Sequence, residues 1–185
     1  MEPAKKLKKY APTVLTFCNL ILGVTVICLL LQNNSLETRR LACYLVFLGV
    51  ACDFFDGFLA RRLQAVTELG KQLDSFADLV TFGVAPVAIF LAGSHSFSWF
   101  TLPILLLYPL AGAYRLARFN LQGYAKYFTG LPITAAGFVL AATLLWYNIF
   151  SGKYTDSFMI YFLSLSFILS LLMVSRLRVK HLDKK

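Results

Sequence analysis

The sequence is poor in charged residues and in the groups from which zinc sites are built. Lys, Arg, Asp and Glu together make up 15% of its 185 residues, whereas 58% are hydrophobic. So apolar a composition excludes an ordinary soluble domain of this size. The two histidines, His95 and His181, lie far apart, and the four cysteines form no Cys-x-x-Cys pair. The usual ligand spacing of a zinc site is therefore missing.

The apolar residues gather into six runs of roughly 20 residues, the length that a helix needs to cross a hydrocarbon core of about 30 Å. The connections between the runs are short and contain no low-complexity linker, so we expect a single domain over residues 1–185. The first run is too long for a signal-peptide core and is expected to be a retained span. The sequence thus predicts an all-α, polytopic membrane protein with six transmembrane helices. The runs cover about Pro12 to Gln32, Leu41 to Arg61, Lys71 to Gly93, Phe100 to Arg118, Leu131 to Phe150 and Phe158 to Arg176.

The basic residues, which give a net charge of +9, are distributed unevenly between the two sides of the predicted membrane. Fifteen of the eighteen lysines and arginines fall on one side, and only Arg39, Arg40 and Lys153 fall on the other. This bias predicts that both termini are cytoplasmic, and it explains the basic excess without nucleic acid as a partner. The basic N-terminus, residues 1–11, and the basic tail, residues 177–185, are expected to contact anionic headgroups of the bilayer.

Four of the nine acidic residues lie inside apolar runs, where an ionised carboxylate costs at least about 2.5 to 3.5 kcal/mol. Asp53 and Asp56 belong to the second run and Asp74 and Asp78 to the third. Their i, i+3 and i, i+4 spacing puts each pair on one helix face, and the two runs should form an antiparallel hairpin. Asp53 then lies at the depth of Asp78, and Asp56 at the depth of Asp74. All four carboxylates are expected to converge.

Convergent carboxylate oxygens without soft ligands are the donor set of a hard divalent cation. We therefore expect Mg²⁺ or Mn²⁺, and four carboxylates are enough to bridge two ions, the arrangement used for displacement at phosphorus. Gly57, Ala60 and Gly70 leave room beside the aspartates. Such small residues serve either close helix packing or a ligand pocket. Next to four aspartates and Arg61, we favour the pocket.

The same residues form a pattern of fixed spacing, Asp53-x-x-Asp56-Gly57-x-x-Ala60-Arg61, eight residues, then Gly70-x-x-x-Asp74-x-x-x-Asp78. At all eight positions this pattern resembles the signature of the CDP-alcohol phosphotransferase family. Over longer stretches the sequence is similar to the bacterial, membrane-type phosphatidylserine synthases of that family. These stretches include residues 13–23 (TVLTFCNLILG), 114–120 (YRLARFN) and 130–137 (GLPITAAG).

The resemblance implies a six-helix enzyme of the inner (cytoplasmic) membrane, commonly homodimeric, with an active site that faces the cytoplasm. It implies transfer of the phosphatidyl group of CDP-diacylglycerol to a small alcohol, L-serine in this subgroup, with release of CMP. Carried over residue by residue, the metal ligands are Asp53, Asp56 and Asp74, and Asp78 is the general base and a further metal ligand. The nucleotide-binding residues are Gly57, Ala60, Arg61 and Gly70.

A serine acceptor carries a carboxylate, which a binding cavity must meet with a cation. Arg115 and Arg118 lie about one turn apart at the end of the fourth run. Either one of them binds the serine carboxylate, or both only anchor the helix as positive-inside residues. A second interpretation keeps the chemistry but takes glycerol 3-phosphate or inositol as acceptor. A third, from a different class, is a cation transporter, because intramembrane carboxylates also mark ion paths. Against a transporter, no polar trail continues beyond the half of the hairpin nearest its turn.

Overall fold

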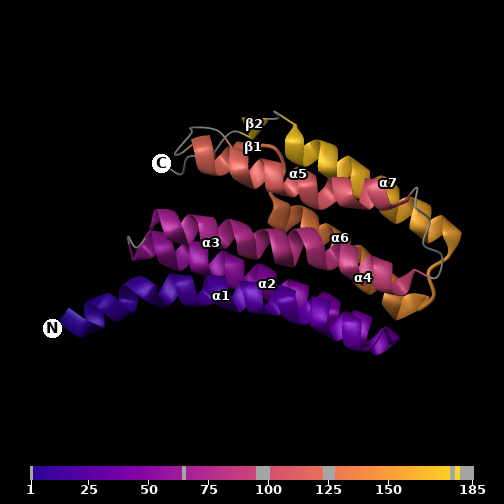
Figure 1. Cartoon of the computed structure of the whole chain (residues 1–185), viewed down its shortest axis with the longest axis horizontal. Helices are drawn as coiled ribbons and strands as arrows, with labels where there is room; N and C mark the ends of the chain where they lie inside the picture. Colours follow the sequence, from indigo (N-terminus) through magenta and orange to yellow (C-terminus); the bar gives the residue numbers. More distant parts are fainter. Residues whose placement is uncertain (1, 64–65, 95–100, 123–127, 176–177, 180–185) are drawn as a thin grey trace.

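A computed structural model describes residues 2–63, 66–94, 101–122, 128–175 and 178–179. These residues form six helical rods that lie side by side (Figure 1), and the predicted all-α class is confirmed. The only strands among them are β1, Phe128–Thr129, and β2, Arg178–Val179, which pair antiparallel. The third rod has three parts, α3, η1 and α4. The helices are α1 Glu2–Gln32, α2 Leu36–Arg62, α3 Glu68–Asp78, η1 Leu79–Val84, α4 Ala85–Gly93, α5 Thr101–Gln122, α6 Ile133–Phe150 and α7 Asp156–Val174.

Five segments of the part that the structure describes are long and apolar enough to cross a membrane. They are Pro12–Gln32, Leu36–Arg62, Glu68–Gly93, Ile133–Phe150 and Asp156–Val174. The remaining rod, α5, is 22 residues long and packs beside α7 (Figure 1), but it contains Arg115 and Arg118, which lower its mean hydropathy. The chain is a multi-pass membrane protein, and α5 takes the place of the fourth predicted span.

The rods alternate in direction, so the bundle has two distinct ends (Figure 1). At the acidic end, named for the aspartates described below, α2, α5 and α7 end and α3 and α6 begin. At the arginine end, named for Arg39 and Arg40, α2 and α7 begin and α6 ends. α1 packs against α2 and the third rod, α5 packs against α7, and α6 contacts both α2 and η1. The two ends of α2 therefore lie in different surroundings.

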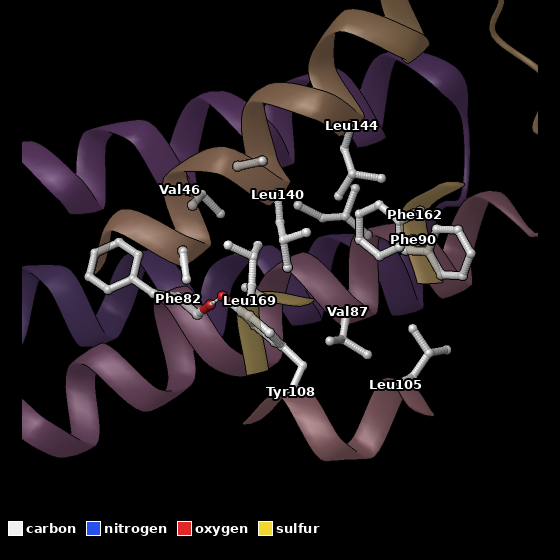
Figure 2. Close-up of a cluster of buried hydrophobic side chains, with 14 of the residues drawn as sticks. Val46, Phe82, Val87, Phe90, Leu105, Tyr108, Leu140, Leu144, Phe162 and Leu169 are labelled. Carbon is white, nitrogen blue, oxygen red and sulfur yellow. Dashed lines mark hydrogen bonds between the residues drawn. The ribbon is translucent and has the colours of Figure 1, made fainter. Parts of the chain in front are cut away.

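The core is built from aromatic side chains packed against small residues, which is how helices associate in a lipid environment. Phe82, Phe90 and Phe162 are almost fully buried, and the rings of Phe90 and Phe162 stack with centroids 4.3 Å apart (Figure 2). Gly137 of α6 lies directly on η1, because a Cβ added there would stand 2.6 Å from the Cβ of Phe82. The middle of the bundle therefore has no spare volume at this contact.

The third rod changes from α-helix to π-helix directly after Asp78, a feature that the sequence analysis does not predict. Pro86 has no N–H, so the carbonyl of Phe82 cannot receive the usual bond from four residues on. The hydroxyl of Tyr108 donates to that carbonyl instead, at 3.0 Å (Figure 2). Thr81 Oγ1 donates to the carbonyl of Asn19 at 2.9 Å, which ties the π segment to α1. Such segments are frequent near functional sites.

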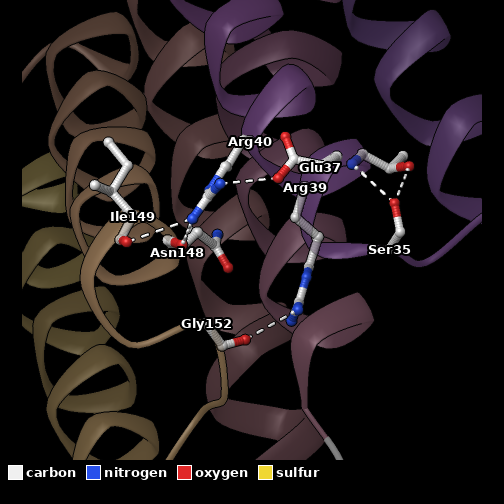
Figure 3. Close-up of polar contacts among 8 residues, drawn as sticks. Ser35, Glu37, Arg39, Arg40, Asn148, Ile149 and Gly152 are labelled. Carbon is white, nitrogen blue, oxygen red and sulfur yellow. Dashed lines mark hydrogen bonds and ion pairs between the residues drawn. The ribbon is translucent and has the colours of Figure 1, made fainter.

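At the arginine end, Arg40 binds the carbonyl groups that close α6. Its Nε and Nη2 donate to the carbonyl of Asn148 at 3.0 and 2.8 Å, and Nη2 also donates to that of Ile149 at 3.4 Å (Figure 3). Its Nη1 lies 2.9 Å from Glu37 Oε1. The last carbonyls of a helix have no partner within the helix, so Arg40 acts as a cap for α6.

Arg39 is buried beside Arg40, with 7% of its surface exposed. Its Nη2 donates to the carbonyl of Gly152 at 3.1 Å (Figure 3), and its guanidinium lies 5.2 Å from the centre of the Tyr154 ring. Because these partners come from the last turn of α6 and from the connection between α6 and α7, both arginines can stand inside a helix. The predicted start of this span at Leu41 is therefore wrong, and α2 begins at Leu36.

Candidate active site

The four intramembrane aspartates meet between α2 and α3. One carboxylate oxygen from each of Asp53, Asp56 and Asp74 lies within 4.8 Å of the other two. The carboxyl group of Asp78 lies within hydrogen-bonding reach of Asp53. Asp53 and Asp78 are thus neighbours, as the register of the predicted hairpin requires. The predicted convergence is confirmed.

This cluster is largely shielded from solvent. Asp56 and Asp78 are buried, Asp53 and Asp74 are half-buried, and Asp74 Oδ1 has no hydrogen-bond partner. The ion pairs found among the described residues join Arg40 to Glu37 and Lys71 to Glu68, so neither includes a site aspartate. Four unneutralised carboxylates in a membrane would cost on the order of 10 kcal/mol. Asp53, Asp56 and Asp74 form a group that can bind a divalent metal ion, which would remove this cost.

Two polar side chains of α1 donate to the cluster. Thr16 Oγ1 donates to Asp56 Oδ2 at 2.9 Å, and Asn19 Nδ2 donates to Asp78 Oδ1 at 3.4 Å. Thr16 is buried and Asn19 is completely so. The sequence analysis does not single out either residue. The available signal is their i, i+3 spacing in an otherwise apolar run, which puts both on one helix face.

A third donor comes from the first turn of α6. Thr134 Oγ1 donates to Asp53 Oδ2 at 3.1 Å. This contact joins the hairpin to the second half of the chain, 81 residues further along. The sequence analysis misses Thr134 as well, because a threonine at the start of an apolar helix carries no signal without its neighbours in space.

The residues predicted to line a nucleotide site do not share one environment. Gly57 faces open space, since an added Cβ would meet only Arg61 Nη1, at 3.6 Å. Ala60 is half-buried and Arg61 is exposed on the same helix. Gly57 is therefore not used for close helix packing, and the predicted space beside it is present in the structure. Gly70 is different, because its N–H donates at 3.0 Å to Oγ1 of Thr67, the residue that caps the start of α3.

The two arginines of α5 lie in different environments. Arg118 Nη1 donates to the carbonyl of Val174 at 3.1 Å and Nη2 to that of Ser175 at 3.4 Å, so Arg118 caps the end of α7. Arg115 is 7% exposed, its Nε has no hydrogen-bond partner, and it interacts electrostatically with Asp78. Arg115 is therefore a buried guanidinium group that interacts with the acidic cluster.

An intramembrane bundle with carboxylates converging on one hairpin has the fold and site of a membrane-embedded enzyme. The chain belongs to the CDP-alcohol phosphatidyltransferase family, whose model matches residues 9–174.

Several relatives carry names that specify their reactions. The chain is 41% identical over 145 residues to the CDP-diacylglycerol–serine O-phosphatidyltransferase of Bacillus subtilis, which covers 75% of this chain and 77% of that protein. It is 34% identical over 178 residues to the archaetidylserine synthase of Methanothermobacter thermautotrophicus, with 93% and 70% covered. A protein of Helicobacter pylori with the same name as the Bacillus enzyme is 34% identical over 152 residues, with 78% and 62% covered.

Proposed function

We propose that this protein transfers the phosphatidyl group of CDP-diacylglycerol to the hydroxyl of L-serine and releases CMP. The observation that carries the proposal is the group of carboxylate oxygens within 4.8 Å of one another, set on the hairpin that bears the family signature. Serine is favoured over glycerol 3-phosphate and inositol because the names of the three relatives above refer to serine or to a serine-containing lipid.

The donor set supports a divalent cation as cofactor, either Mg²⁺ or Mn²⁺. Asp53, Asp56 and Asp74 would hold it, with Asp78 as a further ligand if two ions bind. When bound, such ions neutralise the negative charge that develops on the pyrophosphate oxygens. The unpartnered oxygen of Asp74 supports this fit, because a buried carboxylate oxygen without a donor needs a cation.

The reaction is a single displacement at the phosphorus that carries the diacylglycerol. The serine hydroxyl oxygen forms the new bond to this phosphorus, the bond from phosphorus to the bridging oxygen breaks, and CMP leaves with that oxygen and the electron pair. Asp78 accepts the hydroxyl proton, because a serine hydroxyl is a poor nucleophile at neutral pH until a base removes its proton. Asn19 holds Asp78 in place by donating to its Oδ1.

Arg115 is the group we assign to the carboxylate of the bound serine. It is buried, its Nε is free to donate, and it faces Asp78, the proposed base. A serine held by Arg115 would therefore present its hydroxyl near Asp78. Arg118 is not assigned this role, because its guanidinium is bound to the carbonyls at the end of α7.

Gly57, Ala60 and Arg61 are proposed to line the nucleotide site, with the open space above Gly57 as its supporting observation. Gly70 belongs to the same proposal through its place in the signature, although its N–H already donates to Thr67 Oγ1. The distribution of basic residues supports an acidic end that faces the cytoplasm. The homodimer and the contact with anionic headgroups stay predictions of the sequence.

A direct assay tests the proposal. Purified protein in detergent micelles would receive CDP-diacylglycerol with Mg²⁺ or Mn²⁺ and, in separate reactions, L-serine, glycerol 3-phosphate or inositol. We expect CMP release and a phosphatidylserine product with L-serine alone, and no release from the Asp53→Asn variant. CMP release without serine, or no release with any of the three acceptors, would reject the assignment.

A further inference from the structure

Three aspartates of the hairpin each accept one side-chain hydrogen bond from a helix outside it. The donors are Thr16 and Asn19 on α1 and Thr134 on α6. Each bond occupies one of the four or so lone-pair positions of a carboxylate, so the remaining positions stay available for a ligand. The fourth aspartate, Asp74, has an oxygen with no such partner. The site therefore has an outer layer of donors that fixes the orientation of the carboxylates without occupying them.

The environment of Asn19 is not what stability alone would select. Its side chain is completely buried, and its Oδ1 has no hydrogen-bond partner, which is costly inside a protein. Space for the amide is created by Gly49, since a Cβ added there would stand 2.9 Å from Asn19 Oδ1. An apolar side chain of similar size would avoid the unpaired oxygen. The hydrogen bond to Asp78 is the contact that accounts for an amide at this position.

The backbone also holds Asn19 in register with the third rod. Thr81 Oγ1 donates to the carbonyl of Asn19 at 2.9 Å, and Thr81 stands three residues after Asp78. One residue of α1 is thus bound on two sides, by its carbonyl and by its amide, to the segment that carries the proposed base. This double contact fixes the distance between α1 and Asp78.

Each of the two threonines donates its hydroxyl to one aspartate of the metal-binding group. Thr16 Oγ1 lies 2.9 Å from Asp56 Oδ2 and 3.2 Å from the carbonyl of Pro12, and a hydroxyl has one proton, so the shorter contact to a carboxylate is the stronger bond. Thr134 Oγ1 bonds Asp53 Oδ2. Replacing a group that holds a metal-binding side chain in orientation typically costs about 10- to 100-fold in metal affinity or activity.

We propose that Thr16, Asn19 and Thr134 are positioning residues, the threonines for the metal-binding carboxylates and Asn19 for the base. The inference rests on the proposed function and divides it into two separable parts. Loss of a threonine hydroxyl weakens cation binding, because Asp53 or Asp56 can then rotate. Loss of the Asn19 amide lowers the rate of the chemical step and leaves intact the binding of the ion held by Asp53, Asp56 and Asp74, because Asp78 alone is released.

Thr134→Val tests the first part, with Thr143→Val as a matched control on the same helix. Thr143 is half-buried, and its hydroxyl donates to the carbonyl of Val139, away from the site. The measurement is the dissociation constant of Mn²⁺, obtained by titration calorimetry of the purified, substrate-free protein. We expect a rise of about 10- to 100-fold for Thr134→Val, no change for Thr143→Val, and recovery in Thr134→Ser. A Thr134→Val constant within twofold of that of the unmodified chain would overturn this part.

Asn19→Leu tests the second part. We expect kcat to fall about 10- to 100-fold, with the KM for CDP-diacylglycerol and the Mn²⁺ dissociation constant within twofold of the unmodified values. If Asn19→Leu does not fold, Asn19→Ala replaces it, since alanine adds no bulk. An unchanged kcat in a folded variant, or equal losses in kcat and Mn²⁺ affinity, would overturn the role.

The role of Asp78 as the base and its positioning by Asn19 can be tested separately. If Asp78→Asn remains active, the proposed base is wrong, whatever the Asn19 variants do. If Asp78→Asn is inactive and the Asn19 variants keep full kcat, the base stands and only its positioning by α1 is wrong.

Discussion

The two ends of α2 carry opposite charges, and they differ in the partners that the chain supplies for those charges. At the arginine end, Arg39 and Arg40 bind backbone carbonyls, a tyrosine ring and Glu37. At the acidic end, Thr134 donates to Asp53 and Thr16 donates to Asp56, and the ion pairs found among the described residues include neither aspartate. The two guanidinium groups of the arginine end therefore find most of their partners within the chain, and only Arg39 Nε and Asn148 Oδ1 are left without one among the described residues. The acidic end becomes complete only when a cation arrives, which is the property of a binding site.

The separation along the helix makes this comparison useful. Arg39 and Asp53 are 14 residues apart, or on the order of 20 Å at 1.5 Å per residue. Substitutions at one end should therefore leave the other end almost unaffected. Changes at the acidic end should alter activity with little effect on stability, and changes at the arginine end should do the reverse.

Replacing the proposed base should have the largest effect. Asp78→Asn keeps the size of the side chain but removes the proton acceptor, so we expect turnover to fall by about 10²- to 10⁴-fold with an unchanged melting temperature. The measurement is CMP release from purified protein. Asp156→Asn, an exposed carboxylate in the first turn of α7, is the matched control and should retain full activity. Near-normal turnover in Asp78→Asn would show that Asp78 is not the base and that the acidic end is not needed for the reaction in this way.

Removing Arg40 should give the opposite result. Arg40→Ala leaves the carbonyls of Asn148 and Ile149 uncapped, and we expect a loss of about 1.5 to 3 kcal/mol in the free energy of unfolding. The ion pair with Glu37 adds little, because Glu37 is largely exposed. Thermal unfolding in detergent measures the effect, with the exposed Lys153→Ala as control. The variant should keep its kcat at temperatures where it remains folded, and a lost kcat there would contradict the division of roles.

Two glycines sharpen the comparison, since one has space beside it and the other has none. A Cβ on Gly93 would clash with Tyr154 and Arg39, whereas one on Gly57 would meet only Arg61. We expect Gly93→Ala to destabilise the fold by about 1 to 3 kcal/mol with an unchanged KM. Gly57→Leu should leave the fold intact and raise the KM for CDP-diacylglycerol about tenfold, which corresponds to roughly 1.4 kcal/mol of binding. An unchanged KM for CDP-diacylglycerol in Gly57→Leu would show that the space beside Gly57 does not hold this substrate.

The smallest effect is expected from the hydroxyl of Tyr154, which accepts a hydrogen bond from Asn148 at 3.2 Å. Burial raises the pKa of Tyr154 to about 12. Tyr154→Phe should cost about 0.5 to 1.5 kcal/mol near neutral pH. Between pH 10 and 12 the unfolded tyrosine ionises before the folded one, so the original chain loses stability that the variant keeps. The stability difference should shrink over that range, and a constant difference in thermal unfolding from pH 8 to 12 would contradict this.

Much of the acidic end follows from the sequence, because its determinants are local. The spacing of Asp53 to Asp56 and of Asp74 to Asp78 fixes one helix face each, and the short turn between the runs fixes the register. Contacts from distant segments are a different matter. Nothing in the neighbourhood of Thr134 in the sequence indicates that it reaches Asp53, because that contact depends on how α6 packs against α2.

The arginine end and the π segment are missed for the same physical reason. Arg39 and Arg40 suggest a helix that begins after them. Only the carbonyls of the last turn of α6 and of the connection after it, together with the Tyr154 ring, make both arginines acceptable inside α2. The π segment combines a local cause, the missing N–H of Pro86, with a distant one, the hydroxyl of Tyr108. Spacing can reveal the first cause but not the second.

The central claim, that the acidic end is completed by a divalent cation, is tested most directly by counting bound Mn²⁺. Electron paramagnetic resonance of the purified protein without substrate would report free and bound Mn²⁺ for the unmodified chain, for Asp53→Asn with Asp74→Asn, and for Arg40→Ala. The account predicts saturable binding in the unmodified chain and in Arg40→Ala, and its loss in the aspartate double variant. Equal binding in all three proteins, or none in the unmodified chain, would contradict it.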